Sequence, residues 1–578
     1  MKICREDNSL SIQAKSYTLS VLDSRSVQIR VHDQLIADLR VVSGITGTGD
    51  VDDVSQNLEG PDVQDIGGGI IRLVWTSTSN RWARKTYTFE CTSDLVGYRM
   101  EVQGEGDIDA VHFFEGKQDP PGDPSRYHFS RLFTSECTML DRRDHKAWEY
   151  ACIDATSGQT SEFPQPPFES DHWIFTPPPF VYAWGSVNGV PSSAQKTTWL
   201  GVGLAPDPGH YNFHYFQHWP MQNHFKLRLS YDGMTHVDGF WSSPRIIFKP
   251  ASSEYNAIKE ISEYLYSQQL AVRPRRHLAD WWSRPILCGW GEQVFTSNRN
   301  GGGGAGRFAT QEFYDNILLL LAERKLNPGT IVIDDKWQGQ YGTLEVDPQK
   351  WPDMRGWIDA QHAIGRKVLL WLGCWNAEGL PIGECITHGG NLCCADPSNP
   401  AYEDRLKSAV RRMLSDEPGC YNADGFKVDW TNSVPAGPGF KRHGGIWGVE
   451  LLKKLYEIIY VSAKAIKNDA LIITHAANPY FADVTDMVRL NDMSAIHRNL
   501  ADLMGHRQKI ALAANSDWLI DCDNSTAPTH DEWLRYTIMQ PELGVPSIYF
   551  LTGVDGTMEE IPVEDFAKLP DVWRQEWM

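Results

Sequence analysis

The sequence lacks the features of several large protein classes. It has no apolar run long enough to cross a bilayer, and its first residues, MKICREDNSLSIQ, contain no apolar core of signal-peptide length. Basic residues are fewer than acidic residues, and the net charge is −20 at pH 7. Binding of nucleic-acid or lipid phosphates requires a basic surface instead. We therefore expect no membrane partner and no nucleic-acid partner, and a neutral ligand instead.

Cysteine pairs at metal-binding spacing are also missing. The 11 cysteines are an odd number, none form a C-x-x-C pair, and Cys393 and Cys394 are adjacent rather than spaced. Scattered free cysteines are typical of the reducing cytoplasm, which is the predicted location. Acidic residues together with His475 could bind a divalent ion, but no H-x-H or H-x-x-x-E pair accompanies them. We expect neither a metal nor another cofactor, and a homo-oligomer is compatible with the sequence.

Aromatic residues are abundant instead. The chain has 22 tryptophans, and aromatic residues make up 11% of it. Aromatic faces pack well against the apolar C–H faces of sugars, which favours a carbohydrate ligand. A large protein also has many aromatic residues in its core, so composition alone does not decide between these interpretations.

The pattern of apolar residues predicts two main domains. Residues 1–250 carry short alternating runs separated by Gly, Asp and Asn turns, which predict a large antiparallel β-sandwich. Residues 251–280 are predicted to form a helical linker. In residues 281–578, eight apolar runs end in polar or acidic residues and alternate with amphipathic helices, which predicts an α/β fold of the (β/α)8 TIM-barrel type. The predicted strand segments are 285–292, 329–337, 367–375, 424–430, 470–478, 486–492, 510–520 and 546–553.

Carboxylates gather at the ends of these strands, where a barrel builds its active site. Asp334 and Asp335 lie near the end of the second run, Asp429 near the end of the fourth and Asp492 at the end of the sixth. Two carboxyls about 5 Å apart can cleave an acetal with retention, one as nucleophile and one as acid/base. We interpret Asp429 as the nucleophile, because Lys427 lies on the same face of the strand and lowers its pKa, and Asp492 as the acid/base. A structural ion pair of Lys427 and Asp429 is the alternative.

Four stretches carry a resemblance to a known clan. They are RPILCGWGE, TIVIDDKWQGQYGTLEVDPQKWPD, GFKVDW and ITHAANPYFADVTDMVRLNDMS. Over residues 280–555 the sequence resembles the retaining α-galactosidase clan, glycoside hydrolase families 27 and 36 with family 31 as a relative. It is most similar to family 36, in which a β-sandwich precedes the barrel. The resemblance also implies a C-terminal β-domain, which we expect to be short or absent here.

The resemblance implies roles for particular residues. Asp429 matches the nucleophile, Asp492 the acid/base, and Asp334 with Asp335 the pair that binds the sugar O4 and O6 hydroxyls. The remaining matches are Lys427 as a sugar contact, Trp290, Trp337 and Trp371 as aromatic positions of the site wall, Arg489 as a clamp for a hydroxyl or carboxylate, and His475 as a substrate-lining residue.

Several alternatives stay open. IDCDNSTAPTHDEWLRYTI resembles the acid/base stretch of family 31, which makes Asp523 a rival to Asp492, although the strand count places it on the seventh strand. Lys336 stands where the clan usually has a small residue or Cys, and could select an anionic or otherwise different sugar. The sequence thus predicts a retaining, exo-acting, α-galactosidase-like hydrolase. The alternatives are a transglycosylase of the raffinose-synthase type, an α-glycosidase for a glucosyl or anionic sugar, and a sugar-binding protein on a degenerate barrel.

Overall fold

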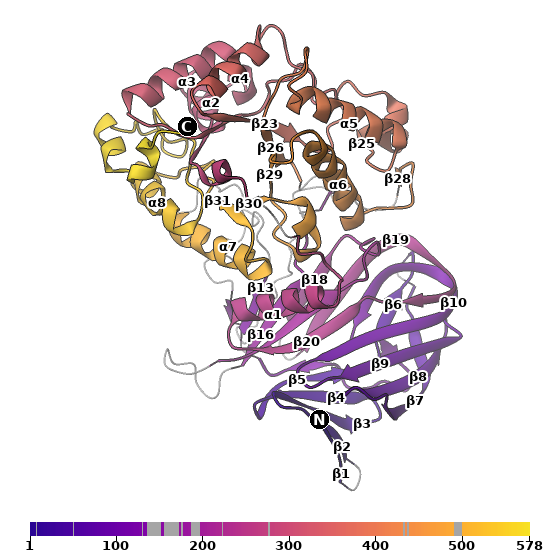
Figure 1. Ribbon diagram of the computed structural model, residues 1–578. Helices are drawn as coiled ribbons and strands as arrows, with labels where there is room; N and C mark the ends of the chain where they lie inside the picture. Colours follow the sequence, from indigo (N-terminus) through magenta and orange to yellow (C-terminus); the bar gives the residue numbers. More distant parts are fainter. Residues whose placement is uncertain are drawn as a thin grey trace.

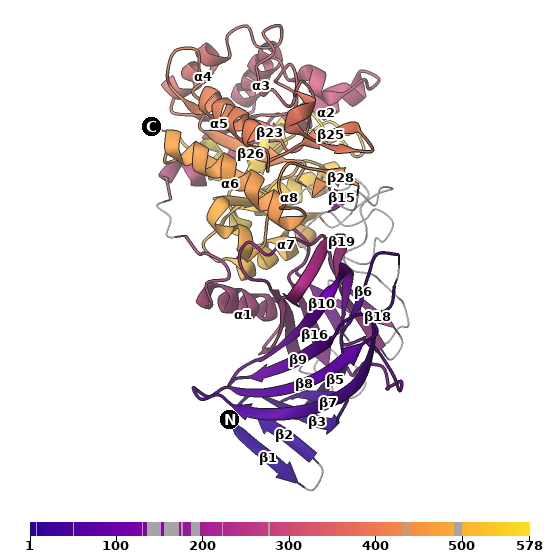
Figure 2. The ribbon, with the colours of Figure 1, turned by 90° about the vertical axis from the view of Figure 1, so that its right-hand side faces the viewer.

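The computed structural model has two parts that are visible in Figures 1 and 2, a curved antiparallel sheet region and a barrel surrounded by helices. It describes residues 1–6, 9–49, 51–129, 131–135, 152–154, 173–174, 177–186, 197–221, 224–274, 278–431, 434–435, 439–490 and 500–577. The arrangement is a TIM barrel preceded by a large N-terminal β-sandwich, which confirms the predicted fold class.

The described residues of the N-terminal region form one 19-stranded sheet that folds around its own core. Several of its strands alternate buried and half-exposed residues, as in β4 (Ser26–Val31), because one face of such a strand packs inward. Its two longest strands, β10 (Val96–Phe113) and β19 (His224–Ser242), pair antiparallel over most of their length. The other strands are β1 Lys2–Glu6, β2 Ser9–Gln13, β3 Tyr17–Asp23, β5 Gln34–Arg40, β6 Gly44–Thr46, β7 Val54–Asp65, β8 Ile71–Ser79, β9 Arg84–Cys91, β11 Lys117–Gln118, β12 Arg126–Tyr127, β13 Arg131–Thr134, β14 Cys152–Asp154, β16 Val181–Ser186, β17 Thr198–Ala205, β18 Phe216–Met221 and β20 Arg245–Ala251.

Eight parallel strands form the barrel. Their order along the sheet is β31-β30-β29-β26-β23-β22-β21-β32, which follows the chain apart from the final strand. A parallel bridge between Asp521 and Val545 joins the two ends, so the sheet closes on itself. The strands are β21 Ile286–Cys288, β22 Thr330–Ile333, β23 Lys367–Gly373, β26 Gly425–Asp429, β29 Leu471–Thr474, β30 Met487–Arg489, β31 Leu519–Asp521 and β32 Ser547–Ile548.

Helices connect these strands and cover the outside of the barrel (Figure 1). They are α2 Trp290–Arg299, α3 Gln311–Glu323, α4 Met354–Ala363, α5 Pro400–Leu414, α6 Val449–Ile466, α7 Leu500–Ala514 and α8 His530–Leu543, with 3-10 turns η1 Asp280–Ser283, η2 Ala305–Phe308, η3 Ile382–Glu384, η4 Pro479–Val484, η5 Val563–Lys568 and η6 Asp571–Arg574. None of the described helices is long and apolar enough to span a membrane. The predicted seventh strand, 510–520, was placed too early, because residues 510–514 complete the buried side of α7 and the strand begins at Leu519.

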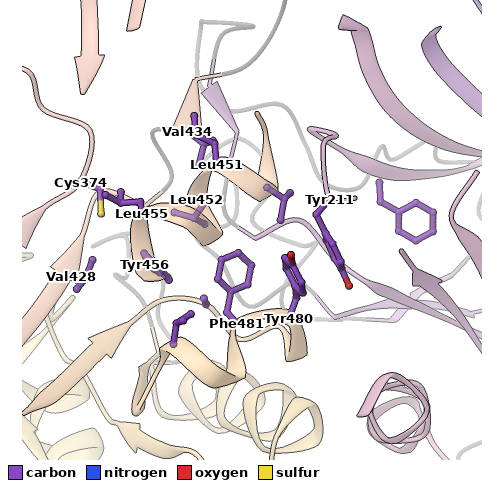
Figure 3. Packing of buried hydrophobic residues seen from close by; sticks show 14 of the residues in the cluster. Tyr211, Cys374, Val428, Val434, Leu451, Leu452, Leu455, Tyr456, Tyr480 and Phe481 are labelled. Carbon is purple, nitrogen blue, oxygen red and sulfur yellow. The ribbon is translucent and has the colours of Figure 1, made fainter. Parts of the chain in front are cut away.

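The two domains are joined by extensive contacts. Helix α1 (Glu254–Ser267) follows the sandwich, packs on β16, β17 and β20, and also contacts α7 of the barrel. Figure 3 shows Tyr211 of the sandwich domain beside Tyr480 of η4, and their rings stack with centroids 3.6 Å apart. Glu450 of α6 secures this contact, because its carboxylate accepts the Tyr480 hydroxyl and the Tyr211 N–H. The barrel and the sandwich therefore share one continuous apolar core.

The sandwich domain also reaches the loop that follows the fourth barrel strand. Strand β15 (Trp173–Ile174) pairs antiparallel with β27 (Val434–Pro435), which lies just beyond β26 in sequence. A second small sheet forms in the same region from β24 (Cys385–His388), β25 (Asn391–Ala395) and β28 (Phe440–Lys441). The N-terminal domain thus contributes backbone hydrogen bonds close to the end of β26.

Candidate active site

Asp429 is the last residue of β26 and lies at the carboxyl end of the barrel. Its side chain is 18% exposed, whereas those of Asp334 and Asp523 are 2% and 0% exposed. Strand β26 reaches this position with four consecutive buried residues, because both of its faces pack against barrel or helix. Asp429 is therefore a carboxylate held by a rigid strand that still has access to a ligand.

The two oxygens of Asp429 differ in their partners. Oδ1 accepts the Trp430 backbone N–H at 2.9 Å, and it lies 3.3 Å from Nη1 of Arg489 and 3.2 Å from Nε2 of His475. Oδ2 accepts the indole N–H of Trp371 at 2.8 Å. The crowded Oδ1 anchors the carboxylate, and Oδ2 is the oxygen with the freer lone pair.

The charge of Asp429 is fixed by its surroundings. Burial by itself would raise the pKa of this carboxyl, but the Arg489 guanidinium, the His475 hydrogen bond and the Lys427 ammonium together hold the pKa well below its usual value. Asp429 is therefore ionised at neutral pH, as a carboxylate nucleophile must be.

Lys427 has a different main partner from the one that the strand pattern suggested. Its Nζ lies 2.6 Å from Oδ2 of Asp334, and both side chains are 2% exposed. The Cys288 thiol donates to the same oxygen at 2.9 Å, and Oδ1 of Asp334 accepts the Asp335 N–H at 2.8 Å. The two side chains thus neutralise each other. Their predicted contacts with a sugar stay predictions.

Asp335 is the more accessible member of the Asp-Asp pair. Burial raises its pKa to about 6, helped by the charges of Asp334 and Asp429, while hydrogen bonding from Tyr341 opposes the rise. The Tyr341 hydroxyl donates to Oδ1 of Asp335 at 2.7 Å. Tyr341 gave no signal in the sequence, because it lies in an irregular loop.

Lys336 belongs to the same cluster. Its Nζ lies 2.6 Å from Oε2 of Glu378 and 3.8 Å from the centroid of the Tyr341 ring. The same Glu378 oxygen accepts the Tyr341 N–H at 2.9 Å. Glu378 therefore neutralises the lysine that departs from the clan pattern, and it fixes the backbone of Tyr341.

The predicted tryptophans occupy three different environments. Trp371 reaches Asp429 directly, and its ring lies near those of Tyr341 and Trp430, 5.8 and 4.9 Å away between centroids. Trp337 is fully buried and donates its indole N–H to the carbonyl of Trp371, so it supports the site from behind rather than lining it. Trp290 opens helix α2 directly after β21 and packs against the core. Trp430 was missed, although it directly follows Asp429 in the sequence.

Arg489 connects two of the carboxylates. It ends β30, is 1% exposed, and places Nε 2.8 Å from Oδ2 of Asp523 and Nη1 3.3 Å from Oδ1 of Asp429. Its Nη1 also lies 3.0 Å from Nε2 of His475. The structure thus brings Asp429, Lys427, Arg489 and His475 together at one end of the barrel. Asp492, the predicted acid/base, lies outside the described residues.

No group of three or more His, Cys, Asp and Glu side chains in the described ranges is arranged to hold a metal ion. The carboxylates instead have nitrogen donors around them, as the contacts of Asp334, Asp429 and Asp523 show.

Comparison with known proteins supports the fold. Neither the scan of protein-family models nor the search of curated proteins finds a match. Among solved structures, the chain is similar to a family 31 sulfoquinovosidase from E. rectale, with a TM-score of 0.56 and 13% identity, covering 99% of this chain and 82% of that one. It is also similar to a cycloalternan-forming enzyme from Listeria monocytogenes, with a TM-score of 0.51 and 12% identity, covering 97% of this chain and 56% of that one. A family 36 α-galactosidase from Geobacillus stearothermophilus aligns at a TM-score of 0.48 and 11% identity, covering 100% of this chain and 87% of that one. The first two likenesses, both at low identity, establish the shared fold.

Proposed function

We propose that the protein is a retaining, exo-acting α-glycoside hydrolase for a neutral sugar of the α-galactoside type, with Asp429 as nucleophile and Asp492 as acid/base. The observation that carries the proposal is the state of Asp429. It is ionised, partly exposed, fixed through Oδ1, and located where a TIM barrel places its chemistry.

The reaction follows from these positions. Oδ2 of Asp429 attacks the anomeric carbon, and the bond from that carbon to the leaving oxygen breaks as Asp492 donates its proton to that oxygen. Asp492 then takes a proton from water, whose oxygen attacks the same carbon and releases Oδ2. The two inversions give net retention. The indole N–H of Trp371 remains on Oδ2 and restricts the direction of attack.

The charge balance favours an uncharged sugar. Near Asp429, Lys336 is paired with Glu378, Lys427 with Asp334, and Arg489 with both Asp429 and Asp523. Each of these cations already faces a carboxylate, so together they offer no excess positive charge to a sulfonate or carboxylate on the substrate. The galacto preference rests on the sequence resemblance of the Asp334–Asp335 pair.

A panel of nitrophenyl α-glycosides, including α-galactoside, α-glucoside and a sulfonated glycoside, tests the substrate class. We expect turnover of a neutral member with retention, which NMR of the first-formed anomer detects. Asp429→Asn should lower kcat by about 10⁴-fold or more while the circular dichroism spectrum stays unchanged, and azide should rescue Asp429→Gly. Normal kcat in Asp429→Asn would refute the mechanism. Preferential transfer to an added sugar acceptor would identify a transglycosylase.

A further inference from the structure

Resting on the proposed function, we infer that Asp523 is a positioning residue that acts through Arg489 to hold the nucleophile Asp429 in place. It is not the proton donor, although its sequence context resembles one. The inference stands on the bridge that Arg489 makes between the two carboxylates.

The bridge is asymmetric. The contact from Arg489 Nε to Asp523 Oδ2 is 2.8 Å, whereas the contact from Nη1 to Asp429 Oδ1 is 3.3 Å. A charge-assisted hydrogen bond at the shorter distance is the stronger of the two. Of the two carboxylates, Asp523 therefore holds the guanidinium more tightly, and we infer that the weaker contact to Asp429 depends on this anchor.

Asp523 is itself firmly placed. Its Oδ1 accepts the Ser525 N–H at 3.0 Å, and its own N–H donates to Oδ1 of Asp521 at 3.0 Å. Asp521 pairs in register with Arg489 across β31 and β30. Both ends of the Asp523–Arg489 contact are thus tied to the neighbouring barrel strands β30 and β31.

Asp523 is also poorly suited to proton donation. Its side chain is 0% exposed, and both of its oxygens have protein partners. Burial would raise its pKa, but the Arg489 and Lys427 charges hold the pKa below its usual value. The neighbouring Asp521 behaves in the opposite way, since burial and the charge of Asp523 raise its pKa to about 6. Asp523 therefore has no proton to give at neutral pH.

The dependence of activity on the leaving group distinguishes a positioning residue from a proton donor. Asp523→Asn removes the charge at constant shape, so we expect kcat to fall about 10–100-fold with KM within about threefold, as for a misplaced nucleophile. The loss should be equal for a dinitrophenyl glycoside, which needs no acid catalysis, and for an unactivated glycoside. Labelling of Asp429 by a 5-fluoroglycosyl fluoride, followed by mass spectrometry, should slow by the same factor. The acid/base variant Asp492→Asn should instead lose most activity on the unactivated substrate.

Asp486→Asn is the matched control. Asp486 immediately precedes β30, is fully buried, and pairs with Lys464 at 2.7 Å, at the opposite end of the strand from Arg489. The Asp486→Asn substitution should lower the melting temperature without changing kcat. If Asp523→Asn does not fold, Asp523→Glu is measured with the same substrates, and an equal loss on both is again expected.

Two results would overturn the inference. One is kcat within twofold of wild type in the folded Asp523 variant, and the other is a loss confined to the unactivated substrate that azide rescues. The proposed function fails separately, if the wild type cleaves no glycoside or if Asp429→Asn stays active.

Discussion

Replacing Lys427 with methionine should strongly destabilise the barrel. The ammonium lies 2.6 Å from Oδ2 of Asp334, and both side chains are 2% exposed. In Lys427→Met the Asp334 carboxylate stays enclosed without its cation, although the Cys288 thiol and the Asp335 N–H still donate to it. Removing one partner of a buried pair costs about 3–5 kcal/mol of unfolding free energy. With an unfolding entropy of about 2.1 cal/mol/K per residue, this loss corresponds to a fall in Tm of roughly 5–8 °C for the barrel domain.

Thermal unfolding followed by circular dichroism measures this effect. Lys407→Met is the control, because Lys407 pairs with Glu403 one helical turn away while its side chain is 47% exposed, and its loss should leave Tm unchanged. The double variant Lys427→Met/Asp334→Asn should regain much of the lost stability, since the unpaired charge is gone. A Tm for Lys427→Met equal to that of the control would refute the reasoning.

Two further changes probe the cluster around Asp335. Tyr341→Phe removes the hydroxyl that donates to Oδ1 of Asp335; because this hydrogen bond favours the ionised carboxylate, the pKa of Asp335 should rise above its value of about 6. The acid limb of the kcat/KM profile should then move to higher pH, and an unmoved limb would show that ionisation of Asp335 does not govern binding. Glu378→Gln removes the carboxylate that neutralises Lys336, so KM for a sulfonated glycoside should fall several-fold relative to KM for the neutral one. Equal KM changes for both substrates would place Lys336 away from the sugar.

The barrel was predictable because its strands are short, apolar and followed by charged residues. The seventh strand was misplaced for a physical reason. Residues 510–514 are all apolar, and a run of five apolar residues is too short to distinguish the helical period from the strand period. The bounds of Leu519–Asp521 are set by pairing with β30, which is a tertiary contact.

The sequence predicted which residues belong to the site better than it predicted which of them contact one another. Period-two spacing places Lys427 and Asp429 on one face, but it does not reveal that Asp334, two strands away around the barrel, is the closer partner of the lysine. Similarly, Trp337 stands in a motif whose pattern indicates a wall position, yet its ring is buried behind Trp371. Contacts between strands and contributions from loops, such as that of Tyr341, depend on the closed barrel and were therefore not available from the pattern.

The pairing of β15 with β27 brings backbone of the sandwich domain close in sequence to the end of β26, where Asp429 lies. A fragment cut between the domains would expose the edge of Val434–Pro435 and uncover the ring face of Tyr480 that Tyr211 shields. Such a fragment would retain every acidic residue discussed above, yet the segment beyond β26 would have lost its neighbour. Residues 281–578 are consequently a poor choice for expressing the barrel by itself, and engineering of this protein should keep both domains in one polypeptide.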